Sequence, residues 1–195
     1  MINFVKNQMH PIAPETGAND CLQAAIYLLE QGVELLELIS DDAYARRLAV
    51  ALNASIGGHY RHCLDHFDCL LESVRESDLI DYDRRKRDLN VESDRKRAIA
   101  VSRRIQQSLR DLPVTQIHTT VSVRCKVHYR VDRTQEVDST FAREIMYVVA
   151  HGVHHFALIA VMARVMDFPL PADFGVAPST LQHRASLAAR VSEVA

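Results

Sequence analysis

The sequence predicts an all-α protein, a four-helix bundle with a crossover between helices 2 and 3 and a small β insertion between helices 3 and 4. Three observations support this fold class. Apolar residues recur at helical spacing in four long stretches, apolar and polar residues alternate in one shorter stretch, and a long polar segment separates the second helical stretch from the third.

The length and composition suit one globular domain. A chain of 195 residues with 48% hydrophobic and 25% charged residues can bury a full core. We therefore expect a single domain over 1–195, with the bundle core at about 19–167 and a C-terminal extension at about 168–195. The net charge of −2 provides no basic field to attract nucleic acid or anionic lipid, so neither is expected as a partner.

The compartment expected from the sequence is the cytoplasm. The cysteines show no CxxC spacing, so neither a zinc ribbon nor a thioredoxin-like redox motif is indicated. We expect no membrane span, because no apolar stretch approaches the required length. Met1–Ala13 also lacks the basic and then apolar layout of a signal peptide.

Four helices follow from the apolar stripes and their end signals. The expected helices run from Asn19 to Ile39, from Leu48 to Arg75, from Ser93 to the residue before Pro113, and from Phe141 to Met166. Asn19 and Ser139 are the expected N-caps of the first and last helix, because a short polar side chain there accepts hydrogen bonds from the first turn. The chain is expected to be irregular over Pro169–Ser179 and weakly helical after it.

The β insertion is expected at about 114–138. Apolar residues occupy alternate positions from Ile117 to Val131, which is typical of a half-buried extended ribbon. Residues Asp132–Glu136 are expected to turn the chain into a second short strand at Val137.

The linker Ser77–Glu92 is longer than two adjacent antiparallel helices need, so we expect it to cross along the bundle. Its basic run, Arg84–Arg87, is flanked by aspartates. We therefore expect a solvated loop there and not a nucleic-acid patch.

Two histidine-rich segments are the best clue to function, because imidazole is the commonest metal ligand in proteins. Six of the ten histidines are His59, His62 and His66 in the second expected helix and His151, His154 and His155 in the last. The first three share one helix face, and His151 shares a face with His155. We expect both faces to form one metal site, with His154 in a structural or supporting role.

The spacing of His151 and His155 matches the HExxH zinc helix, but that motif's base is missing. Gly152 stands where the motif has glutamate, so a zincin-type protease is disfavoured. Glu144 lies on the same stripe, seven residues before His151, and could orient an imidazole or act as a base. Asp65 is a second carboxylate that could fill this role.

These segments resemble the DinB/YfiT-like family of metal-binding four-helix bundles. The resemblance is carried by His62-Cys63-Leu64-Asp65-His66 and by Arg143-Glu144-Ile145 leading to His151-Gly152-Val153-His154-His155-Phe156-Ala157. It extends over about 19–166 by helix order and these two motifs. The β insertion and residues 173–178 are elaborations.

The resemblance implies an up-down-down-up bundle and a divalent ion bound by three histidines. Carried over by motif position, the ligands are His62, His151 and His155, with His59 or His66 as replacements for His62. Neutral nitrogen ligands suit Zn²⁺, Ni²⁺ or Fe²⁺ and do not discriminate among them. Members of the family are often homodimers, and characterised ones include thiol-dependent transferases and metal-dependent hydrolases.

The function expected from these features is a metal-dependent enzyme, either a thiol transferase or a hydrolase. Its substrate would be a small molecule, with a low-molecular-weight thiol as one candidate. A divalent ion on three neutral imidazoles lowers the pKa of a bound water or thiol toward neutrality. The alternative is a non-catalytic, stress-related or structural protein whose ion only joins the second and fourth helices. A catalytic site keeps an open coordination position, whereas a structural site is closed.

Overall fold

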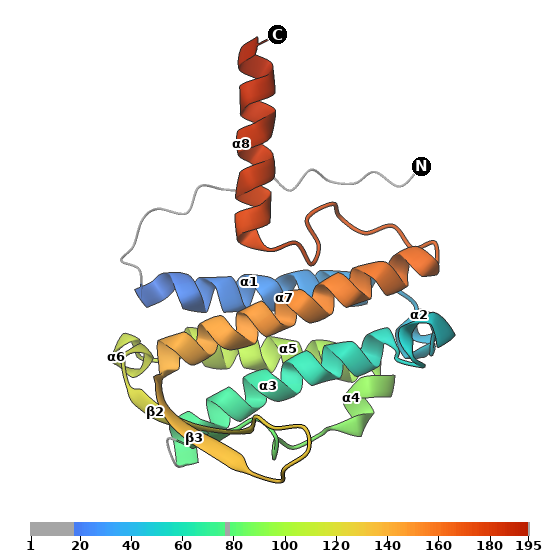
Figure 1. Cartoon of the computed structure of the whole chain (residues 1–195). Coiled ribbons are helices and arrows are strands. Elements are labelled where there is room, and N and C mark those ends of the chain that lie inside the picture. The colour runs from blue at the N-terminus through green and yellow to red at the C-terminus, as the bar shows by residue number, and fades with distance from the viewer. Residues whose placement is uncertain (1–17, 77–78, 195) are drawn as a thin grey trace.

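The computed structural model describes residues 18–76 and 79–194 (Figure 1). Met1–Ala13, whose layout bears on the signal-peptide prediction, and His10 lie outside the described residues. The elements are α1 (Ala18–Leu38), α2 (Asp41–Ala45), a 3-10 turn (Ala49–Ala51), α3 (Ile56–Glu76), β1 (Leu79–Asp81), α4 (Leu89–Ser93), α5 (Arg95–Arg110), α6 (Val114–Ile117), β2 (Thr120–Lys126), β3 (Thr134–Thr140), α7 (Phe141–Val165) and α8 (Pro178–Val194).

The long helices α1, α3, α5 and α7 enclose the hydrophobic core. Helix α1 packs against α5 and α7, and α3 packs against the same two helices. Tyr60 and Phe67 on α3 and Phe141 and Phe156 on α7 are among the largest fully buried side chains. The Tyr60 hydroxyl lies 2.8 Å from the Ser102 hydroxyl on α5, so this buried polar group has a partner.

A three-stranded mixed sheet lies beside these helices, in the order β1-β2-β3. Strand β1 pairs in parallel with β2, with Ile80 opposite Val123, and β2 pairs in antiparallel register with β3, with Thr120 opposite Thr140. Strand β3 leads directly into α7 (Figure 1). The sheet therefore positions the start of the helix that carries the second histidine segment.

The predicted all-α four-helix bundle is wrong. The described residues also form the short helices α2, α4 and α6, the C-terminal helix α8 and the mixed sheet. Strand β1 and most of helix α4 lie in Ser77–Glu92, which was expected to be a plain crossover linker. A three-residue strand has no measurable period, and its hydrogen bonds go to a strand far along the chain. Local pattern therefore cannot reveal it.

Helix α3 begins at Ile56 and not at the predicted Leu48. Leu52 adopts a left-handed φ of 54°, which ends the preceding 3-10 turn. The Ser55 hydroxyl then accepts a hydrogen bond from the Gly58 backbone N–H at 3.0 Å, which caps the new helix. The chain therefore turns before α3, where the prediction had continuous helix.

Two other predicted helix starts also differ from the structure. Helix α5 begins at Arg95 and not near Ser93, because the Asp94 side chain accepts a hydrogen bond from the Arg97 N–H at 3.0 Å and caps it. Asn19 lies inside α1 and is therefore not its N-cap.

Helix α7 begins at Phe141 as predicted, but its N-cap is Thr140 and not Ser139. The Thr140 hydroxyl accepts a hydrogen bond from the Arg143 N–H at 3.3 Å. By length and composition α7 could cross a membrane, so the expectation that no stretch approaches that length is wrong. A core helix of a soluble protein meets the same criteria, and α7 packs against α1 and α3.

The β insertion is confirmed as a hairpin. Strand β2 is shorter than the predicted ribbon, β3 is longer than the short strand predicted at Val137, and the chain turns at 127–133 and not at Asp132–Glu136. The predicted C-terminal helicity is confirmed by α8 (Pro178–Val194), which projects away from the other helices in Figure 1. The extent of the domain, 1–195, stays a prediction.

Candidate metal centre

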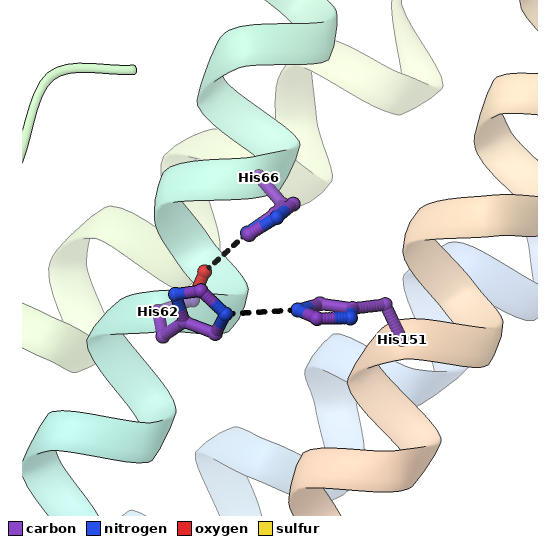
Figure 2. Close-up of side chains that lie close together, drawn as sticks. All are labelled: His62, His66 and His151. Carbon is purple, nitrogen blue, oxygen red and sulfur yellow. Dashed lines mark hydrogen bonds between the residues drawn. The ribbon is translucent and has the colours of Figure 1, made fainter. Parts of the chain in front are cut away.

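Histidines from α3 and α7 meet between the two helices. One ring nitrogen from each of His62, His66 and His151 lies within 4.8 Å of the others, and Figure 2 shows the three rings facing one another. His62 Nε2 is 3.0 Å from His151 Nε2. Nitrogens bound to one ion at about 2.1 Å lie a little over 3 Å apart, so small movements of these rings would accommodate a metal. The three histidines could hold a metal ion.

His66 has the ring orientation that a metal ligand needs. Its Nδ1 donates a hydrogen bond to the backbone carbonyl of His62 at 2.8 Å. Because Nδ1 carries the proton, Nε2 keeps its lone pair for an ion, as is usual for metal-bound histidine. His66 is also buried, with 4% of its surface exposed. The sequence analysis offered His66 only as a replacement for His62, whereas in the structure both rings belong to the same group.

His155 and His59 extend the group. The His155 ring centroid lies 4.6 Å from the centroids of both His62 and His151, and its Nδ1 is 3.0 Å from His59 Nδ1. The set predicted by resemblance, His62, His151 and His155, therefore lies within one cluster with His66. We call these five imidazoles, including His59, the histidine cluster. They exceed the number that a three-nitrogen site requires.

Burial keeps the cluster uncharged at neutral pH. Burial, reinforced by neighbouring imidazoles, lowers the pKa of His62 to about 2 and that of His155 to about 3. It also lowers the pKa of His66 to about 4, although the bond to the His62 carbonyl opposes this shift. The pKa values of His59 and His151 are lowered in the same direction, mainly by burial. Neutral imidazole is the form that binds metal.

Arg85 contacts the cluster from the segment that follows β1. Its Nη2 lies 2.8 Å from His62 Nδ1, and its Nη1 donates to the Tyr82 carbonyl oxygen. The Arg84 side chain is 84% exposed, and Lys86 and Arg87 are exposed as well. The prediction of a solvated loop is therefore wrong only for Arg85. Nothing in a run of four basic residues distinguishes the one that turns inward.

Two tyrosines stack on the ligand candidates. The Tyr82 ring lies 5.3 Å from the His66 ring at 23°, and the Tyr147 ring lies 5.9 Å from the His151 ring at 22°. The Tyr82 hydroxyl donates to Glu144 Oε2 at 3.0 Å. Glu144 is thus linked to the cluster through Tyr82, and its other oxygen accepts from the Ser139 hydroxyl at 2.7 Å.

The remaining candidates lie around the cluster. Asp65 is buried and accepts from Arg61 Nη1 at 2.7 Å, while His154 is exposed. At Gly152, where HExxH helices carry glutamate, a Cβ atom would stand 2.5 Å from Leu28 Cδ2. This position therefore serves the close packing of α7 on α1.

The fold and the site define a largely helical protein with a candidate histidine metal centre. No family model matches the chain. Among curated proteins, the chain is similar to a Rhizopus delemar protein named FK506-binding protein 5, with 26% identity over 164 residues. The match covers 83% of this chain but 37% of that relative. The chain therefore spans well under half of the relative's length.

Proposed function

We propose that this chain is a divalent-metal-binding, DinB-like protein that acts as a metal-dependent enzyme, either a thiol-dependent transferase or a hydrolase. The observation that supports it best is the meeting of uncharged imidazoles from α3 and α7, with ring nitrogens within 4.8 Å. The two motifs that resemble the DinB-like family lie on these two helices. A small-molecule substrate and a homodimer belong to the same proposal and rest on the resemblance.

We propose His62, His66 and His151 as one ligand set and His62, His151 and His155 as the other. The first set is supported by the His66 ring, whose Nδ1 is bound to a backbone carbonyl. The second is supported by the resemblance and by the 4.6 Å ring separations of His155. Zn²⁺, Ni²⁺ and Fe²⁺ all suit such nitrogen ligands.

A bound divalent ion would supply Lewis acidity, which lowers the pKa of a coordinated water or thiol toward neutrality. The protein's own part is to hold the imidazoles neutral and in place. Tyr82 and Tyr147 stack on His66 and His151 and so restrain the planes of these rings. Glu144 is a positioning residue in this scheme, because it acts through its hydrogen bond from Tyr82.

Metal analysis of protein purified without an affinity tag tests the proposal directly. We expect about one divalent ion per chain in the wild type and almost none in His151→Ala, with the helical circular dichroism signal unchanged. His183→Ala is the matched control, because His183 is exposed on α8. A His151→Ala variant that keeps the wild-type metal content would show that the site is misassigned.

The alternative is a structural or stress-related protein in which the ion only joins α3 to α7. It is favoured by the origin of the ligands, since both helices contribute to the site. X-ray absorption on the zinc-loaded protein distinguishes the two functions. A coordination shell with a water ligand supports the enzyme, whereas a shell filled by protein nitrogens supports the structural role.

A further inference from the structure

Arg85 carries a buried hydrogen-bond donor with no partner. Its Nη1 donates to the Tyr82 carbonyl and its Nη2 to His62 Nδ1, but its Nε has no hydrogen-bond partner among the described residues. Leaving a buried donor of a charged group unpaired is costly, so such atoms indicate a missing partner. The unpaired Nε therefore points to a partner from outside the chain.

The charge of Arg85 is attracted by the carboxylates of Asp65 and Asp83 without direct contact. The buried carboxylate of Asp65 pairs with Arg61, and Asp83 accepts a hydrogen bond from the Lys126 backbone N–H. Among the described residues, no carboxylate forms an ion pair with Arg85 within 4.0 Å. A guanidinium next to neutral imidazoles, with no carboxylate bound, is suited to an anion.

The bond from Arg85 to His62 conflicts with metal binding. A guanidinium nitrogen can only donate, so His62 Nδ1 accepts and the proton of the neutral ring sits on Nε2. Nε2 is the atom that faces His151 at 3.0 Å, and it needs a free lone pair to bind an ion. Once Nε2 holds an ion, Nδ1 carries the proton and can no longer accept from Arg85. Loading His62 through Nε2 therefore releases Arg85.

The released guanidinium presents a complete two-donor edge. Nε and Nη2 lie on the same side of the planar group, and a carboxylate binds such an edge through both oxygens. Building on the proposed function, we propose that Arg85 binds the carboxylate of a small-molecule ligand beside the metal ion. The carboxylate neutralises a guanidinium charge that would otherwise repel the divalent ion, so carboxylate and metal each favour the binding of the other.

Cobalt titration with acetate as the probe tests this coupling. Co²⁺ binding is followed by its visible absorption, with and without sodium acetate at constant ionic strength and with free Co²⁺ corrected for acetate complexation. In the wild type we expect acetate to tighten Co²⁺ binding at least about fivefold, because coupling between two sites is commonly of this size or larger. Linkage requires Co²⁺ to tighten acetate binding by the same factor, which acetate NMR relaxation measures.

Variants assign the effect to Arg85. Arg85→Gln should bind Co²⁺ and show no acetate effect, and Arg85→Lys, which keeps the charge but lacks the two-donor edge, should lose most of it. Arg84→Gln, at the exposed neighbouring position, should behave as the wild type. Co²⁺ binding that acetate leaves unchanged in the wild type, or an acetate effect that survives in Arg85→Gln, overturns the inference alone. A wild type that binds no Co²⁺ overturns the proposed function with it.

Discussion

The Nδ1 atom of His66 donates a hydrogen bond to the carbonyl oxygen of His62, one turn earlier on α3, at 2.8 Å. The acceptor is a backbone atom, so the bond sets the tautomer of His66 without a second side chain. Nε2 is thereby left as the acceptor, and the His66 ring lies next to those of His62 and His151 (Figure 2). This hydrogen bond makes His66 a ligand candidate, and it could not be predicted from the spacing of the histidines.

His66→Ala is expected to weaken zinc binding by more than the 10- to 100-fold that typically follows loss of a supporting partner, because it removes a ligand nitrogen. Zinc affinity is measured by competition with a chromophoric chelator. His183→Ala is the control, since His183 is exposed on α8, and should change the affinity little. If His155→Ala rather than His66→Ala abolishes binding, the ligand set is the one implied by the resemblance.

The metal-free protein is expected to lose stability as the pH falls below about 6.5. Burial lowers the pKa of His62, His66 and His155 below the ordinary value of 6.5, so the unfolded chain binds protons that the folded chain does not. The free energy of unfolding is therefore highest above pH 6.5 and decreases toward pH 5, by at most about 1.4 kcal/mol per pH unit for each extra proton.

Urea unfolding of chelator-treated protein at pH 8, 6 and 5 measures this dependence. His66→Gln should flatten it, because one of the three histidines no longer titrates. His183→Gln, on the exposed face of α8, should leave it unchanged. A free energy of unfolding that stays constant from pH 7 to pH 5 would contradict the assignment of buried, neutral imidazoles.

Gly57→Ala is expected to destabilise the protein although alanine favours helix. A Cβ atom at Gly57 would stand 2.0 Å from the carbonyl oxygen of Glu92, a backbone atom of helix α4. Overpacking of this kind costs about 1–3 kcal/mol, more than the roughly 1 kcal/mol gained from helix propensity. At Gly58 the nearest atom is 3.4 Å away, so Gly58→Ala should be neutral or stabilising. Thermal unfolding of both variants measures the difference in stability. Equal melting temperatures for Gly57→Ala and Gly58→Ala would contradict the prediction.

Tyr82→Phe is expected to lower the free energy of unfolding by about 1–3 kcal/mol, because the buried carboxylate of Glu144 loses a donor. The phenyl ring of this variant keeps the stacking on His66, so zinc affinity should fall by less than about tenfold, the lower end of the loss typical of a supporting partner. Tyr27→Phe removes a hydroxyl from an exposed residue and should change stability by no more than about 0.5 kcal/mol. A Tyr82→Phe variant as stable as the wild type would show that Tyr82 does not support Glu144.

Local pattern predicted the elements whose signal is long and repeated. The apolar stripe of Phe141–Val165 and the alternation around β2 were recognised because each element repeats its period several times. The all-α description failed because β1 spans only Leu79–Asp81 and is defined by pairing with β2. The turn before α3 was missed because Leu52 adopts a positive φ that its residue type does not announce.

By itself, the sequence determined which histidines share a helix face, because positions three, four or seven apart superpose on any α-helix. It thereby pointed to a metal site from the spacing of His151 and His155 and of His62 and its neighbours. Only the tertiary structure decided that His66 stands with His62 and His151, that Arg85 turns inward, and that Glu144 reaches them through Tyr82. These relations join α3, α7 and the segment after β1. They depend on how the chain packs, which the period of a single helix does not encode.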